Sequence, residues 1–128
     1  MKPASYWESV YDIVRLVPRG RVTTYGIIAD YLSLGSSRMV GWALNNCHEM
    51  SDVPAHRVVN RKGELSGRHH FRPPGLMQSL LEDEGLEIIN DTVKNFKELV
   101  WLPEKELFLL IFVLEFDRLF LPFNSLFS

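Results

Sequence analysis

Two short amphipathic segments on either side of Gly35 constrain the fold of this chain more than any other feature. Residues 25–33 and 37–44 each carry apolar side chains at helical spacing, and the glycine interrupts the pattern between them. Thr24 is expected to cap the first helix, and one of the two serines at 36 and 37 the second. Two short helices joined by a tight turn are typical of a helix-turn-helix unit, although other small helical bundles also contain such pairs. The side chains expected to face inward are Ile27, Ile28, Tyr31 and Leu32 in the first helix and Val40, Ala43 and Leu44 in the second.

A longer amphipathic helix is expected before this pair, and a further one after it. The earlier helix begins with a capping box in which Ser5 precedes Glu8 by three positions, and Pro18-Arg19-Gly20 ends it with turn residues. The later helix spans about residues 74–84 and ends at Gly85. Their expected core faces are Trp7, Val10, Tyr11, Val14 and Val17 in the earlier helix and Leu76, Leu80 and Leu81 in the later one.

The middle of the chain has a different pattern. Residues 56–59 indicate an extended segment, residues 60–63 a turn and residues 64–65 a return strand. The expected fold is therefore mainly α with a small β hairpin, a winged helix-turn-helix-like DNA-binding domain. With 128 residues, the chain is expected to form one such domain over residues 1–106, followed by an apolar tail of unknown role over residues 107–128.

The distribution of charge favours a nucleic-acid partner more than the net charge of −2 does. Between residues 19 and 72, eight Lys and Arg residues stand against four acids, which leaves +4. Between residues 73 and 128, four bases stand against ten acids, which leaves −6. Because a partner meets one face of a protein, the local excess of positive charge is the relevant quantity.

Other features exclude several classes of protein. The single cysteine, Cys47, makes neither an internal disulfide nor a cysteine-based zinc site, and it favours a reducing compartment. The pair His69-His70 is weak evidence for a metal, so no metal or cofactor is expected. The apolar run 107–114 is short for a membrane span, which needs roughly 20 apolar residues, and the first eight residues lack the apolar run of a signal peptide. We therefore expect no membrane partner. The expected location is the cytoplasm, in association with the nucleoid, or the nucleus if the source is a eukaryote.

The run Pro-Ala-His-Arg-Val-Val at residues 54–59 is the sharpest motif. With Ser-Arg-Met-Val-Gly-Trp-Ala-Leu at 37–44 and Leu-Glu-Asp-Glu-Gly at 81–85, it resembles the DNA-binding domain of the O6-alkylguanine-DNA alkyltransferases over about residues 5–105. Those repair proteins carry Pro-Cys-His-Arg-Val at this place. The chain is more similar to the alkyltransferase-like proteins, in which the acceptor cysteine is replaced, commonly by tryptophan or alanine.

The resemblance implies recognition of damage without repair. Ala55 stands at the acceptor position, and its methyl group cannot form the thioether that alkyl transfer requires. His56 and Glu84 are then the vestige of the pair that activates the thiolate, and Arg57 is expected to bond backbone or carboxylate groups around the site. The implied function is to bind and flip O6-alkylguanine in double-stranded DNA and to flag it for nucleotide excision repair proteins, as a monomer that is not an enzyme.

The resemblance also implies roles for individual residues. Tyr25 pushes on the target phosphate, Arg38 fills the vacated stack, and Arg68 lies over the flipped base. The residues expected to contact DNA, in the minor groove, are Tyr25, Ser37, Arg38, Met39, Trp42 and Ala43. The residues expected to line the lesion pocket are Tyr25, Val53, Pro54, Ala55, Val58, Ser66 and Arg68.

Two alternatives from other classes remain open. The chain is an active methylated-DNA–protein-cysteine methyltransferase if another nucleophile, Cys47, replaces the missing one, although a lone cysteine is more often a small buried hydrophobic residue. It is a winged-helix transcription regulator if it reads sequence through phosphate and base contacts without preferring a lesion.

Overall fold

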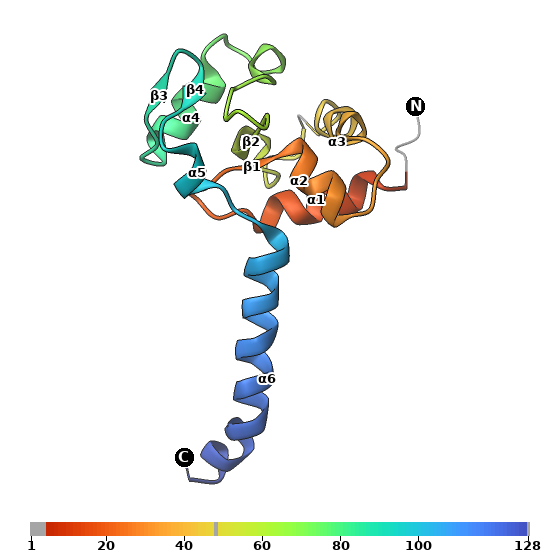
Figure 1. Cartoon of the computed structure of the whole chain (residues 1–128), viewed down its shortest axis with the longest axis vertical. Helices are drawn as coiled ribbons and strands as arrows, with labels where there is room; N and C mark the ends of the chain where they lie inside the picture. Colours follow the sequence, from red (N-terminus) through yellow and green to blue (C-terminus); the bar gives the residue numbers. More distant parts are fainter. Residues whose placement is uncertain (1–4, 48, 128) are drawn as a thin grey trace.

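The computed structural model describes residues 5–47 and 49–127, with side chains up to residue 118. It consists of a globular part and one long helix, α6 (Pro103–Phe127), that projects from it (Figure 1). The predictions that concern residues 1–4, residue 128 and the tail side chains beyond residue 118 lie outside the described residues. The expected fold class, mainly α-helical with a small β hairpin, is confirmed.

Helix α1 (Trp7–Leu16) forms where the apolar spacing predicts it and buries Val10, Tyr11, Ile13 and Val14. The predicted capping box is wrong. Tyr6 is the N-cap residue, its backbone is already helical, and no side chain caps the helix. The Tyr6 hydroxyl instead donates a hydrogen bond of 2.9 Å to the Met39 carbonyl, so this tyrosine ties the start of α1 to the third helix.

The helix-turn-helix pair comprises α2 (Tyr25–Tyr31) and α3 (Ser37–Leu44). Both predicted caps are confirmed, because Thr24 Oγ1 accepts from the Ile27 N–H at 3.0 Å and Ser36 Oγ accepts from the Arg38 N–H at 3.1 Å. The inner stripe of α3 is buried as predicted: Val40, Ala43 and Leu44. Tyr31 departs from the prediction, because its side chain is 42% exposed and lies toward α6.

The strand predicted to begin a hairpin at residues 56–59 pairs with a different segment. Strand β2 (Val58–Val59) lies parallel to β1 (Thr23–Thr24) and does not fold back on residues 64–65. The turn after β2 closes locally, since the Asn60 N–H donates to the Glu64 carbonyl at 3.0 Å, and Glu64 then bridges to Thr92. The antiparallel hairpin of the fold is formed later in the chain by β3 (Ile88–Ile89) and β4 (Thr92–Val93).

The core has two parts, which lie on either side of the β1–β2 pair (Figure 1). The first part lies among the three N-terminal helices. The second lies under α4 (Leu76–Asp83), α5 (Phe96–Leu99) and the β3–β4 hairpin. In α4, Met77 and Leu81 are buried, whereas Leu76 and Leu80, predicted to face the core, are only partly buried. Two short 3-10 turns, η1 (Ala55–Arg57) and η2 (Arg68–His70), lead into and follow β2.

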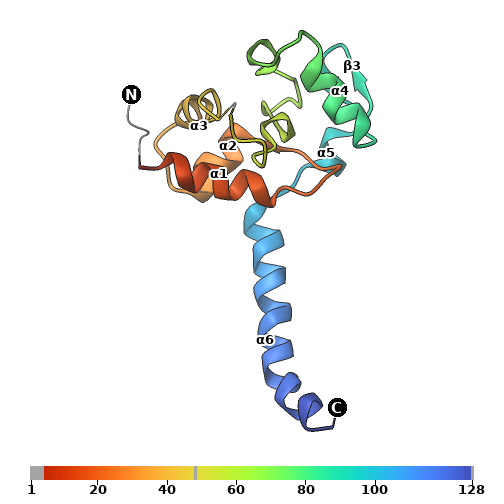
Figure 2. The ribbon, with the colours of Figure 1, turned by 180° about the vertical axis from the view of Figure 1, so that it is seen from behind.

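Helix α6 leaves the globular part on the side opposite α3, as both views show (Figures 1 and 2). The predicted domain boundary after residue 106 lies inside this helix. Within the part of the chain that the structure describes, no helix is long and apolar enough to cross a membrane.

Candidate nucleic-acid interface

The exposed surface of α3 carries an arginine and a tryptophan. Arg38 lies in the first turn and is exposed, and Trp42, one turn later, has 54% of its surface exposed. Ser37 is exposed as well, and Met39 is partly buried. Ala43 has no exposed surface, because it packs in the core with Val40 and Leu44. The prediction that Ala43 contacts DNA is corrected accordingly: the helix turns this side chain inward and turns Trp42 outward.

Tyr25 lies between α3 and the segments that follow β2. It lines one hollow with residues of α3, among them Arg38 and Trp42, and a second hollow with Arg61 and Lys62. Its hydroxyl hydrogen-bonds to Ser66, and burial raises the pKa of the phenol. A methyl group on Gly67 would lie 2.7 Å from Tyr25 Oη, so only glycine fits this position without a shift of the tyrosine.

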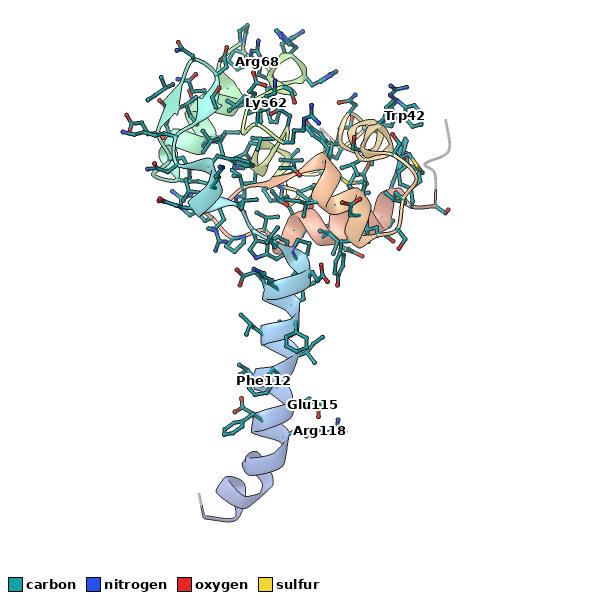
Figure 3. The ribbon with its side chains drawn as sticks, viewed as in Figure 1. Trp42, Lys62, Arg68, Phe112, Glu115 and Arg118 are labelled. Carbon is teal, nitrogen blue, oxygen red and sulfur yellow. The ribbon has the colours of Figure 1, made fainter. Side chains whose placement is uncertain are left out.

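Basic residues from separate loops lie on the same side of the globular part as α3. Trp42, Lys62 and Arg68 all point away from α6, on the far side of the molecule (Figure 3). Lys62 follows β2 in the closed turn, and Arg68 begins η2. The local positive charge predicted for residues 19–72 therefore includes a face that α6 leaves uncovered.

A cleft of about 760 Å³ opens beside Ala55. Of the predicted pocket residues it contains Val53, Pro54 and Ala55, and His56 and Arg57 lie beside them. Further walls come from the end of α1, from the last residue of η2 and the segment after it, and from α4. The remaining lining residues are Arg15, Cys47, Met50, Ser51, Asp52, His70, Phe71, Arg72, Leu76 and Leu80.

The other predicted pocket residues lie outside this cleft. Val58 is fully buried in the β1–β2 pair, so it stands behind the cleft wall. Tyr25 lines the two hollows described above and hydrogen-bonds to Ser66. Arg68 lines a separate, smaller hollow, where it donates to the Leu65 carbonyl at 3.0 Å and lies 3.5 Å from Asp91 Oδ2. Held this way, Arg68 lies outside the cleft that contains Ala55.

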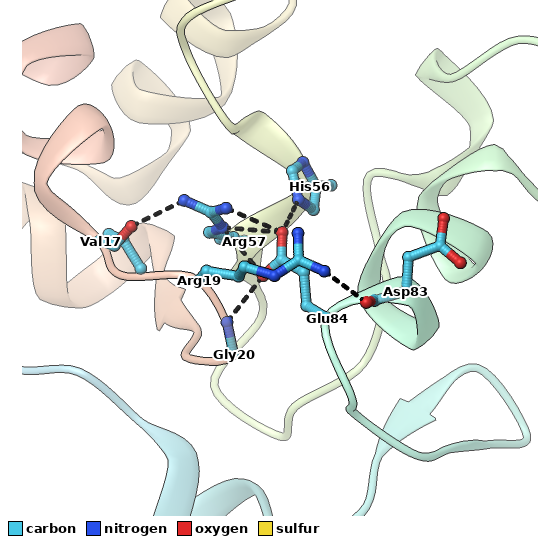
Figure 4. A network of polar contacts seen from close by, with 7 residues as sticks. All are labelled: Val17, Arg19, Gly20, His56, Arg57, Asp83 and Glu84. Carbon is cyan, nitrogen blue, oxygen red and sulfur yellow. Dashed lines mark hydrogen bonds and ion pairs between the residues drawn. The ribbon is translucent and has the colours of Figure 1, made fainter.

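The carboxylate of Glu84 is the centre of a polar network behind the cleft (Figure 4). Glu84 Oε2 lies 2.6 Å from His56 Nε2, and Arg57 Nε contacts both carboxylate oxygens at 3.0 Å. The Gly20 N–H donates to Glu84 Oε1 at 2.8 Å, and Arg57 Nη1 donates to the Val17 carbonyl at 2.9 Å. The network therefore joins the loop after α1, the turn η1 and the end of α4.

This environment fixes the charges of the network. Burial alone would raise the pKa of Glu84, whose side chain is only 3% exposed, but the hydrogen bonds from Arg57, Gly20 and His56 lower it to about 2. Burial lowers the pKa of His56, the positive charges of Arg57 and Arg19 add to this effect, and together they outweigh Glu84, which raises it. At neutral pH, Glu84 is ionised and His56 is neutral, with its Nε2–H donated to the carboxylate.

Two further contacts hold the loop before η1. Arg15 Nε donates to Asp52 at 2.9 Å, which ties α1 to this loop. Cys47 is 4% exposed, its thiol donates to the Leu44 carbonyl at 3.1 Å, and burial raises its pKa. In the part of the chain that is described, no three His, Cys, Asp or Glu side chains gather as a metal site requires.

Sequence reasoning missed the backbone members of this site. It expected Arg57 to bond backbone or carboxylate groups, and both kinds of partner are present. It did not find Gly20, whose N–H donates to Glu84 from a backbone with a positive φ of 83°. The one local signal for this residue was its place in the turn Pro18-Arg19-Gly20. It also did not predict the close approach of Gly67 to the Tyr25 hydroxyl, because no local pattern marks this contact.

The paired helices α2 and α3, with Arg38 and Trp42 exposed on α3, have the arrangement of a helix-turn-helix DNA-binding domain. The chain belongs to the 6-O-methylguanine DNA methyltransferase family, because the model of that family's DNA-binding domain matches residues 5–86. It is 36% identical to alkyltransferase-like protein 1 of Schizosaccharomyces pombe over 108 residues, which are 80% of this chain and 100% of that protein. It is 34% identical to a DNA base-flipping protein of Vibrio parahaemolyticus over 97 residues, which are 73% of this chain and 93% of the relative.

A solved structure agrees with these sequence relationships. The crystal structure of S. pombe Atl1 in complex with damaged DNA containing O6-carboxymethylguanine superposes with a TM-score of 0.69 at 36% identity. The match covers 80% of this chain and all of that one. The expectation of an alkyltransferase-like relationship is confirmed.

Proposed function

We propose that this chain recognises O6-alkylguanine in double-stranded DNA, rotates the damaged nucleotide out of the stack and holds it without transferring the alkyl group. Ala55 occupies the position at which active family members hold the acceptor cysteine. The observation that carries the proposal is that an unreactive methyl group faces the cleft beside an intact His56–Glu84–Arg57 network.

The chemistry of alkyl transfer supports this reading. Transfer forms a bond between the alkyl carbon and a nucleophile, and releases guanine as the leaving group. Ala55 has no lone pair to donate. Cys47 lines the same cleft, but its burial and raised pKa disfavour the thiolate that attack requires. The pocket therefore retains the means to hold a base and lacks the means to dealkylate it.

The surface of α3 supports base rotation. Arg38 is exposed at the start of the helix, and among the described residues no ion pair holds its guanidinium. It is positioned to enter the space that a rotated base vacates, where its planar group stacks and donates hydrogen bonds. Tyr25, which lies behind it against Ser66, is positioned to meet the phosphate of the target nucleotide. Ser37, Met39 and Trp42 complete the surface that approaches the groove.

The relatives are consistent with this role. The S. pombe protein was crystallised with DNA that contains an O6-alkylated guanine, and other relatives are named for base flipping. In a protein that binds and does not repair, the bound complex serves as the signal, and nucleotide excision repair proteins are its expected readers. Such a protein works where the chromosome is, in the nucleoid or the nucleus.

A binding assay tests the proposal. Fluorescence anisotropy with a duplex that carries one O6-methylguanine should give at least about tenfold tighter binding than the same duplex with guanine. Arg38→Ala should reduce that preference, and Lys62→Ala should weaken binding to both duplexes equally because a phosphate contact is independent of sequence. Lys97→Ala, on α5, is the matched control and should change neither.

The assay also separates the alternatives. Equal affinity for both duplexes, with tight binding to some undamaged sequence, would identify a transcription regulator. A protein mass that increases by one methyl group after incubation with the damaged duplex would identify an enzyme, and peptide mapping to Cys47 would locate its nucleophile. Unchanged mass together with lesion preference supports recognition without transfer.

A further inference from the structure

Helix α6 exposes more apolar surface than any other element. Seven consecutive residues, 108–114, each have between 51% and 67% of their surface exposed, and they have no charged residue among them. Exposed apolar side chains that are contiguous on this scale mark a surface that another apolar surface covers. A helix that is apolar on more than one face is normally buried by a neighbour. The globular part does not cover it, because α6 projects away from it (Figure 1).

The charges at the two ends of this run specify what kind of surface fits. Glu104, Lys105 and Glu106 precede the run, and Glu115, Asp117 and Arg118 follow it, with Arg118 3.6 Å from Glu115 of its own helix. If a second copy of α6 lies antiparallel to the first, centred on Ile111, Glu104 faces the partner's Arg118, because both lie seven residues, about two turns, from Ile111 and share its face of the helix. In a parallel pair with the same overlap, each of these charges faces its own copy, which is repulsive. The charge pattern is therefore self-complementary in one orientation.

A groove at the base of α6 gives an independent indication. It measures about 780 Å³ and lies between α2 and the first turns of α6, with Tyr31 and Phe108 among its apolar walls and Asp30, Glu104 and Lys105 as its charged lining residues. The antiparallel register brings the partner's Arg118 to the level of Glu104, at the mouth of this groove. An arginine there meets a net negative charge, because Asp30 and Glu104 outnumber Lys105.

We propose that two copies of this chain associate through α6 in an antiparallel pair centred on Ile111. This inference replaces the sequence-based expectation of a monomer. It does not depend on the proposed DNA function. The overlap from Glu104 to Arg118 spans about 21 Å at 1.5 Å per residue. Because α6 leaves the globular part opposite Trp42, Lys62 and Arg68 (Figure 3), the pair leaves that face open in both copies.

Sedimentation equilibrium of the full chain is the direct test. We expect a species of twice the chain mass that dissociates on dilution. Glu104→Arg alone, and Arg118→Glu alone, should each raise the dissociation constant about tenfold or more, because each places like charges opposite one another twice in the pair. The two changes together in one chain should restore the affinity. Glu98→Arg, the same change on exposed α5, is the control and should have no effect.

Cysteine cross-linking tests the register. Cysteines bridge only when their Cα atoms are within about 7 Å, and Cys47 is buried, so the background is low. Ile111→Cys should form a disulfide-linked pair under mild oxidation, whereas Glu104→Cys should not. Cross-linking of both variants would indicate a parallel pair and overturn the register.

Other outcomes overturn the association itself. A chain that remains monomeric at high micromolar concentration, or an assembly whose mass is unaffected by either charge reversal, is incompatible with the proposal. A monomer that binds vesicles of neutral phospholipid through α6 would assign the surface to a membrane instead. Far-ultraviolet circular dichroism of each variant verifies that the helices are retained, so that a loss of association is not a loss of folding.

Discussion

The imidazole of His56 lies 2.6 Å from Glu84 Oε2, although the neighbouring side chain at position 55 offers no group for this pair to activate. The same carboxylate accepts from Arg57 and from the Gly20 N–H. The structure therefore explains why such a pair is useful without catalysis: it fastens the turn η1, which carries Ala55, to two other parts of the fold.

Ala55→Cys should gain alkyl-transfer activity. The new thiol would stand beside His56, which is neutral and able to accept its proton through the ring nitrogen that does not face Glu84. Mass spectrometry after incubation with O6-methylguanine DNA should show one added methyl group, located at residue 55 by peptide mapping. Ala55→Ser is the control of similar size and should remain unmodified. Absence of transfer in Ala55→Cys, with lesion binding retained, would mean that His56 is misaligned for catalysis.

Glu84→Gln should destabilise the fold by about 3–5 kcal/mol, because it removes the charge from a buried pair and leaves Arg57 uncompensated. Urea unfolding followed by circular dichroism measures the change. The matched control is Glu82→Gln, an exposed position two residues earlier in α4, for which we expect a change below about 0.5 kcal/mol. Equal effects of the two substitutions would contradict the structural role of the network.

Stability should fall with falling pH in two stages. The pKa of His56 is lowered in the folded protein, so the unfolded chain binds more protons below about pH 6.5 and the first loss begins there. The pKa of Glu84 is lowered from 4.5 to about 2, so its contribution, about 3 kcal/mol, is fully present above pH 4.5 and is lost as the pH falls toward 2. Free energies of unfolding measured across this range should show both stages.

His56→Gln separates the two stages. It removes the upper titration and should leave the lower one in place, because Arg57 and Gly20 still hold the carboxylate. An unchanged slope between pH 7 and 5 in this variant would show that other groups cause the upper loss.

Gly67→Ala should weaken lesion binding through Tyr25. The backbone of Gly67 has φ −88°, which alanine adopts without strain, so the only obstacle is the contact of 2.7 Å with the tyrosine hydroxyl. The shift of the ring should lower affinity for O6-methylguanine DNA by about tenfold or more while changing stability by less than about 1 kcal/mol. In a Tyr25→Phe background the alanine should have a much smaller effect, because the atom it displaces is gone. An equal effect in both backgrounds would exclude this route.

Local contacts were predictable from the sequence because both partners lie within a few residues. Thr24 and Ser36 cap their helices through N–H groups only three and two positions away. The prediction of a capping box at the start of α1 failed where a contact is not local, since Tyr6 at that end of the helix bonds to Met39 in α3. The spacing of apolar residues likewise located the core face of α3, and it should have excluded Ala43 from the surface.

Pairings between distant segments were not predictable in this way. Val58 and Val59 are compatible with a hairpin, but both are fully buried, and burial favours pairing with Thr23 and Thr24 in the middle of the molecule over pairing with an exposed turn. The set of residues that lines the cleft was likewise not predictable from local patterns. The family resemblance placed Arg68 in the lesion pocket with Ala55, whereas Asp91 and the Leu65 carbonyl hold its guanidinium at another hollow.

The sequence by itself determined what position 55 is able to do, because the reactivity of a side chain is a property of its atoms, and an alanine has no nucleophile in any fold. It also determined the family, through three short motifs in order. Only the tertiary structure decided what the surrounding residues do now. Glu84 serves His56, Arg57 and Gly20 together because folding brings all three within hydrogen-bond distance of its carboxylate. Such a shared contact depends on three loops meeting in space, and no local pattern encodes it.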